Sequence, residues 1–126
     1  MTTILVVDDL GIDLMLTRMA LEGYQKAYRI LLARDGEEAH RLLQASDVDL
    51  LLLDIKMPRV DGFELLERLR ADGGKPIPTI ILSGSGLAAD RARAQALGVT
   101  DYIQKAVDYG AFKDELKATL ERHGLA

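Results

Sequence analysis

Short, wholly apolar runs that end abruptly in charged residues set the strongest limit on how this chain can fold. Residues 3–7 form one such run before Asp8 and Asp9, and Leu50–Leu53 form another before Asp54. Runs of this length without polar alternation are typical of strands buried on both faces. Stretches with helical spacing separate these runs. The alternation predicts an α/β domain in which helices cover both faces of a parallel sheet.

The apolar runs and the stretches with helical spacing place the expected strands and helices along the chain. Strands are predicted at residues 3–7, 29–33, 49–54, 79–82 and 102–104. Helices are predicted at about residues 12–23, from residue 36 onward, around residues 63–69, and at about residues 87–97 and 109–122. The helical spacing of Met15, Leu16, Met19 and Ala20 indicates the first helix. We expect one domain over residues 1–126, and Met1 together with the end just after the last helix favours a single-domain protein.

Composition excludes several classes of function. The 126 residues include no cysteine, which excludes disulfides, cysteine nucleophiles and thiolate metal sites. The two histidines, His40 and His123, are far apart, which argues against a histidine-rich metal centre. Sixteen basic and twenty acidic residues give a net charge of −4, unfavourable for direct DNA or membrane binding. The apolar runs fall far short of the roughly 20 residues that span a bilayer, so we expect a cytoplasmic protein.

Chemically active side chains follow the predicted strands. Asp8 and Asp9 follow the first, Asp54 the third, Ser83 the fourth and Lys105 the fifth. Each alone is more often a turn, capping or surface residue, except that Asp54 is harder to dismiss because it closes a run of four leucines. Together they stand at the carboxyl ends of the strands, where sheets of this class bind ligands. Clustered carboxylates without histidine or cysteine favour Mg²⁺. A carboxylate can also act as a nucleophile and form an aspartyl phosphate.

Four segments carry a resemblance to a known family: Val7-Asp8-Asp9, the stretch from Leu53 to Gly62, Leu82-Ser83-Gly84, and Tyr102-Ile103-Gln104-Lys105. Over about residues 3–122 the chain resembles the receiver domain of bacterial two-component response regulators, of the single-domain, chemotaxis-regulator-like type. Met57-Pro58 and Asp61-Gly62, at their distances from Asp54, are the most specific part. The resemblance implies a flavodoxin-like, doubly wound sheet with strand order 2-1-3-4-5. It also implies a phosphorylation-dependent signalling switch that catalyses its own phosphorylation and dephosphorylation.

The resemblance assigns the metal and phosphate chemistry residue by residue. Asp54 is similar to the phosphoacceptor, and Asp9 is similar to the residue that binds Mg²⁺ directly. Asp8 would act largely through water, and the backbone carbonyl of Lys56 would be the third protein ligand. The implied metal site therefore consists of Asp8, Asp9, Asp54 and Lys56.

The resemblance also implies how a signal would leave the site. Lys105 would pair with the phosphate, and Ser83 would hydrogen-bond a phosphate oxygen once Asp54 is phosphorylated. Tyr102 is similar to the aromatic switch that turns inward when Ser83 moves. The output surface would be the fourth helix, the fifth strand and the fifth helix. Serine at position 83 replaces the commoner threonine, but it keeps the hydroxyl, so we expect switching to survive.

A second departure from the family pattern lies next to Lys105. The family usually has proline after this lysine, in a cis peptide bond, and this chain has Ala106. Cis bonds to residues other than proline are rare, which favours trans. The loop must still deliver Lys105 to the site, and strained backbone is found preferentially at functional sites. We expect the cis bond to be retained.

Three alternative functions remain open at this stage. A phosphatase or phosphotransferase with an aspartyl nucleophile usually has a second aspartate two residues later, where this chain has Lys56. A flavin-phosphate carrier needs an anion cradle after the first strand, where Asp8 and Asp9 would repel a phosphate. A receiver-like binding module that is never phosphorylated would not need the complete acceptor site.

The resemblance implies a sensor histidine kinase or a phosphotransfer protein as the phosphodonor. Val107-Asp108-Tyr109 and the Ser-Gly-Ser loop are similar to small regulators paired with phytochrome-type kinases. The sequence does not identify the downstream protein, and it leaves room for a homodimer.

Overall fold

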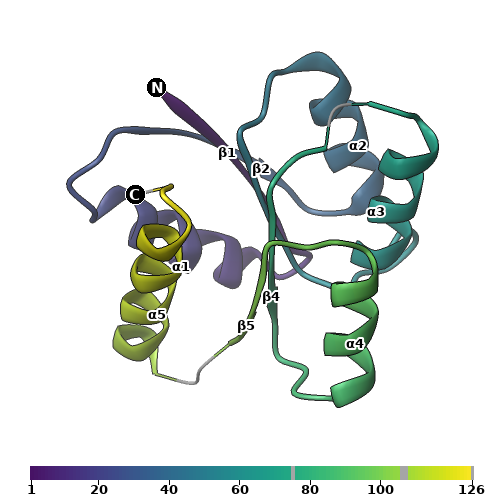
Figure 1. Cartoon of the computed structure of the whole chain (residues 1–126). Helices are drawn as coiled ribbons and strands as arrows, with labels where there is room; N and C mark the ends of the chain where they lie inside the picture. Colours follow the sequence, from purple (N-terminus) through teal and green to yellow (C-terminus); the bar gives the residue numbers. More distant parts are fainter. Residues whose placement is uncertain (75, 106–107, 126) are drawn as a thin grey trace.

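The computed structural model describes residues 1–74, 76–105 and 108–125, and it forms a five-stranded sheet with helices on both sides (Figure 1). The elements in chain order are β1 (Thr2–Val7), α1 (Gly11–Glu22), β2 (Tyr28–Ala33), α2 (Gly36–Ala45), β3 (Leu50–Leu53), α3 (Gly62–Ala71), β4 (Thr79–Ser83), α4 (Ala88–Ala96), β5 (Asp101–Gln104) and α5 (Tyr109–Arg122). Neighbouring strands are parallel in the order β2-β1-β3-β4-β5. The predicted doubly wound fold is confirmed.

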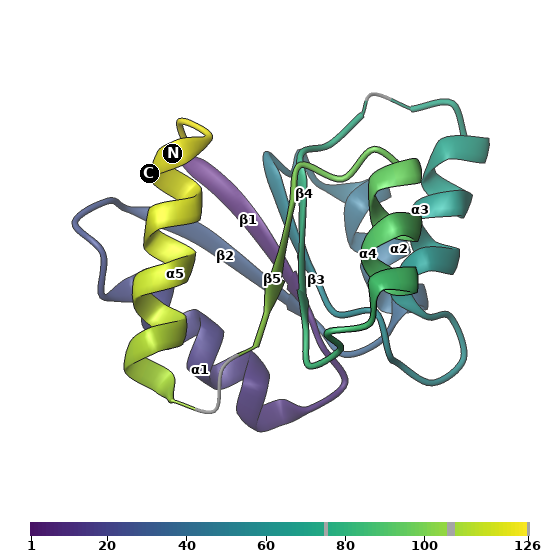
Figure 2. The ribbon, with the colours of Figure 1, turned by 60° about the horizontal axis from the view of Figure 1, so that its bottom comes forward.

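Two apolar layers hold the helices against the sheet. Helices α1 and α5 cover one face, and α2, α3 and α4 cover the other (Figure 2). The leucine run of β3 divides between the layers. Leu50 and Leu52 pack on the α1/α5 side, whereas Leu51 and Leu53 pack on the opposite side. Because successive side chains of a strand point to opposite faces, a central strand covered on both faces must be apolar throughout.

Helix α1 was predicted from the right spacing, but of the residues used for the prediction Ala20 is buried and the two methionines are exposed. Met15 and Met19 are 55% and 53% exposed, whereas Leu14, Ala20 and Leu21 are buried. The helix also begins and ends one residue earlier than predicted. Apolar residues occupy more than one face of α1, so periodicity identifies a helix without choosing the face that meets the sheet.

Two further predictions concern a membrane-spanning segment and one peptide bond. In the part of the chain that the structure describes, no helix combines the length and hydropathy needed to cross a bilayer. The peptide bond between Lys105 and Ala106, expected in cis, lies outside the described residues.

Candidate phosphoacceptor site

Three carboxylates meet where β1 and β3 end. Strand register brings them together, because Val7 pairs with Leu53 and the Asp54 amide donates to the Val7 carbonyl at 2.9 Å. One oxygen each from Asp8, Asp9 and Asp54 lies within 4.8 Å of the others. Asp8 is 3% exposed and Asp54 is 7% exposed. Like charges this close and this buried are unfavourable unless a cation or a proton neutralises them.

The loop after β3 is shaped to hold Asp54 against α3. A Cβ atom on Gly62 would lie 2.4 Å from the Asp54 carbonyl oxygen, so only glycine fits this approach. Asp61 caps α3 by accepting from the Glu64 amide at 2.8 Å. Met57 and Val60 are buried in the apolar layer beneath the loop. Met57, Asp61 and Gly62, from the distinctive Met-Pro and Asp-Gly pairs of the sequence, therefore anchor the loop that follows Asp54.

Lys105 brings a positive charge to the three carboxylates. Its Nζ donates to Asp8 Oδ2 at 2.5 Å and lies 4.0 Å from Asp54 Oδ2. It also donates to Asp13 Oδ2 at 3.0 Å. The sequence analysis did not identify Asp13, because this residue lies inside the first turn of α1 and not at a strand end.

The electrostatics of the site follow from burial. Burial, opposed by the Lys105 charge and reinforced by the charges of Asp8 and Asp9, raises the pKa of Asp54 from 3.8 to about 6. The backbone amide of Lys56 favours the charged Asp54 carboxylate and limits the rise of this pKa. Burial alone would lower the pKa of Lys105, but Asp8, Asp54 and Asp13 outweigh it and raise this pKa above its ordinary value. At neutral pH Asp54 is therefore mostly an anion and Lys105 a cation.

Ser83 and Tyr102, the predicted switch pair, are connected through Ser85. Ser83 Oγ is buried at the end of β4 and accepts from the Ser85 amide at 3.1 Å. The Tyr102 hydroxyl donates to the Ser85 carbonyl at 2.8 Å. The Arg91 guanidinium stands over the Tyr102 ring, 4.5 Å from its centroid. Ser85 is a second residue that the sequence did not single out, because it looked like loop composition.

The loop between β4 and α4 is itself tied to α4. The Ser85 hydroxyl donates to Asp90 Oδ2 at 2.6 Å and accepts from the Leu87 amide at 3.2 Å. Through Ser85, therefore, a buried serine, a tyrosine of β5 and the first turn of α4 share one hydrogen-bonded loop.

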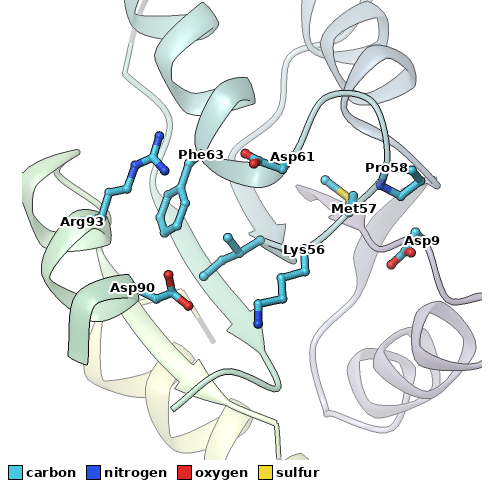
Figure 3. A pocket seen from close by; sticks show the side chains of 9 residues that line it. Asp9, Lys56, Met57, Pro58, Asp61, Phe63, Asp90 and Arg93 are labelled. Atoms are coloured by element: carbon cyan, nitrogen blue, oxygen red, sulfur yellow. The ribbon is translucent and has the colours of Figure 1, made fainter. Parts of the chain in front are cut away.

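A pocket of about 450 Å³ opens beside the carboxylates, between the β3–α3 loop and α4 (Figure 3). The Lys56 side chain and Asp9 reach it from one side, and Asp90 and Arg93 reach it from α4. Its full lining is Asp9, Ile55, Lys56, Met57, Pro58, Asp61, Phe63, Asp90 and Arg93. Of the three clustered carboxylates, Asp9 lines this pocket.

Comparison with known protein families identifies this arrangement. Residues 4–117 match the model of the response regulator receiver domain. The chain belongs to this family. Receiver domains of two-component response regulators act in phosphorylation-dependent signalling, and Mg²⁺ binding is typical of them.

Individual relatives agree with this membership. Response regulator GtcR of Aneurinibacillus migulanus is 39% identical over 103 residues, which are 82% of this chain and 41% of GtcR. The phosphorylated cyanobacterial phytochrome response regulator RcpA is 31% identical, with a TM-score of 0.85 over 95% of this chain and 91% of RcpA. The Mn²⁺-bound form of response regulator Rcp1 is 25% identical, with a TM-score of 0.84 over 99% of this chain and 95% of Rcp1. The chain spans half or less of the length of the curated relatives it matches.

Proposed function

We propose that Asp54 is the phosphoacceptor of this receiver domain. The observation that carries the proposal is the meeting of Asp54 with Asp8 and Asp9 within 4.8 Å, beside the Lys105 ammonium. An Asp54 carboxylate oxygen attacks the phosphorus of a phosphohistidine on a partner kinase or phosphotransfer protein. A phosphorus–oxygen bond forms, and the phosphorus–nitrogen bond breaks with its electron pair returning to the imidazole. Lys105 stabilises the charge of the transferring group.

The oxygen ligands fit a divalent cation, and we propose Mg²⁺. Asp8, Asp9 and Asp54 offer carboxylate oxygens close enough to share one ion, and the Lys56 carbonyl would complete the protein ligands. A set of oxygens without nitrogen or sulfur suits a hard cation. Rcp1, a structural relative, binds Mn²⁺. When bound, the ion would neutralise charge on the phosphoryl oxygens.

The test is covalent labelling by a small phosphodonor. With Mg²⁺ and acetyl phosphate, intact mass spectrometry should show one phosphoryl group, removed by hydroxylamine as expected for an acyl phosphate. Asp54→Asn should abolish it. Asp49→Asn is the matched control, because Asp49 lies at the opposite end of the same leucine run and contacts the Thr3 amide. Stoichiometric labelling of Asp54→Asn would refute the assignment.

We propose that the signal leaves through α4, β5 and α5. The support is the hydrogen-bonded loop in which Ser85 joins Ser83 to Tyr102 and to α4. A phosphoryl oxygen that takes the Ser83 hydroxyl would pull on this loop and shift Tyr102 between two populations. Amide hydrogen exchange should therefore change in α4, β5 and α5 on phosphorylation, and not in α2. Changes confined to the acceptor loops would contradict this route.

We also propose that residues 1–126 act as one receiver domain with a phytochrome-type histidine kinase as phosphodonor. The support is the likeness to RcpA, a phytochrome response regulator, over nearly the full length of both chains. Purified, labelled kinases can be compared directly. A phytochrome-type kinase should transfer its phosphoryl group faster than kinases with unrelated sensor domains. Equal or slower transfer from the phytochrome-type kinase would contradict the assignment.

A further inference from the structure

Asp13 reaches the acceptor site through Lys105. Its Oδ2 lies 3.0 Å from the Lys105 Nζ, and its side chain is 27% exposed, compared with 5% for Asp8 and 9% for Asp54. Asp13 therefore forms a half-buried ion pair at the margin of the site. The three carboxylates that can share a metal do not include it, so its partner at the site is the lysine.

The lysine is held on the α1 side of the site. An ammonium group has three N–H donors. Lys105 directs donors to Asp8 at 2.5 Å and to Asp13 at 3.0 Å. Asp54 Oδ2, at 4.0 Å, lies beyond hydrogen-bond distance. Two of the three N–H donors of Lys105 are therefore directed to Asp8 and Asp13, on the side away from Asp54.

We propose that Asp13 is a positioning residue that holds the Lys105 ammonium back from Asp54 and thereby slows phosphoryl acceptance. The proposal rests on the function proposed above. When Asp54 attacks an acyl phosphate, a phosphorus–oxygen bond forms and the bond to the leaving carboxylate breaks, with the electron pair leaving on that carboxylate. Lys105 would stabilise the transferring group more strongly after turning from Asp13 towards Asp54. The contact with Asp13 is longer and more exposed than that with Asp8, so it is the easier one to give up.

A purely structural role for Asp13 makes a different prediction. Asp13 is an acidic residue in the first turn of α1, where it interacts favourably with the helix dipole. Among the described residues, no side chain caps α1 at Leu10. If Asp13 served only the helix, its replacement would lower the melting temperature and leave the rate of phosphoryl transfer unchanged. The rate is therefore the informative measurement.

The experiment compares Asp13→Asn with wild type for labelling by acetyl phosphate at saturating Mg²⁺. We expect the rate constant to rise about threefold to fivefold, the upper part of the range for one solvent-accessible ion pair. Glu22→Gln is the control. It removes the same charge from the same helix, but Glu22 pairs with Arg18, at 2.6 Å, and not with Lys105. It should leave the rate unchanged. Asp13→Glu, which keeps the charge, should bring the rate back towards wild type.

Two further measurements distinguish a direct contact between Asp13 and Lys105 from a long-range effect of the Asp13 charge. A long-range charge effect should disappear in about 0.5 M KCl, whereas the effect of a direct contact should persist. In a Lys105→Met background, Asp13→Asn should no longer change the rate. Three results would each overturn the proposal. The labelling rate of Asp13→Asn could lie within twofold of wild type, the rate increase could disappear at high salt, or Asp13→Asn could raise the rate equally in the Lys105→Met background. If Lys105→Met labels too slowly to measure, the high-salt comparison decides. Failure of wild type itself to label would instead refute the assigned acceptor.

Discussion

Asp54 and Asp101 are both partly or fully buried carboxylates of the same sheet, but the fold treats them in opposite ways. Asp101, at the start of β5, accepts from the Arg122 guanidinium at 2.9 Å and from the Tyr102 amide at 2.8 Å, and His123 Nε2 lies 2.9 Å from it. Burial alone would raise the pKa of Asp101, but hydrogen bonds from His123, Tyr102 and Arg122 outweigh it and lower this pKa. Burial raises the pKa of Asp54 to about 6.

The surroundings of the two side chains explain the opposite pKa shifts. Asp101 is surrounded by donors and stabilises the end of α5 against β5. Asp54 shares one lysine with Asp8 and Asp13 and stands among like charges. The charge of Asp54 is thus unfavourable in the metal-free protein, and a bound cation would relieve the repulsion.

Removing the Asp54 charge should have the largest effect on stability. In metal-free buffer near pH 7.5, Asp54→Asn should increase the free energy of unfolding by about 2–3 kcal/mol, because the pKa stands at about 6 instead of 3.8. The folded protein keeps the Asp54 proton to higher pH than the unfolded chain does, so wild-type stability falls as pH rises through this window. Urea denaturation in EDTA should show the gain at pH 7.5 and little gain near pH 4. A gain that is absent, or equal at both pH values, would contradict this.

Adding a cation should recover nearly as much in the wild type. At about a hundred times its dissociation constant, Mg²⁺ should stabilise the fold by about 2.7 kcal/mol, because it binds the folded site and not the unfolded chain. Asp9→Ala should abolish this response, whereas Glu22→Gln should keep it. Thermal unfolding with and without Mg²⁺ measures both. A wild-type melting temperature that does not respond to Mg²⁺ would count against the metal site.

Removing the charge of Asp101 should change the stability in the opposite direction and by a smaller amount. Asp101→Asn should lower the free energy of unfolding by about 1 kcal/mol at pH 7, because the Arg122 guanidinium loses its negatively charged acceptor. The lowered pKa of Asp101 means that its contribution is present at neutral pH and is lost only as pH falls below 3.8. Urea denaturation at pH 7 and pH 3.5 checks this. An Asp101→Asn protein more stable than wild type would remove the contrast with Asp54.

The sequence could predict those site residues that directly follow a strand. Apolar runs located β1, β3 and β4, so Asp8, Asp9, Asp54 and Ser83 could be placed at one edge of the sheet. Asp13 and Ser85 could not be found this way, because their roles depend on how α1 and the β4–α4 loop pack. The exposed methionines of α1 show the same limit, since periodicity does not choose between two apolar faces.

Borohydride reduction of the phosphorylated protein tests the role of Asp54 most directly. This reagent converts an aspartyl phosphate to homoserine, and tandem mass spectrometry of the peptides then locates the change without any mutation. After labelling with acetyl phosphate and Mg²⁺, homoserine should appear at position 54 alone. Homoserine at position 8, 9 or 13 would show that another carboxylate of the cluster is the nucleophile and would contradict the assignment.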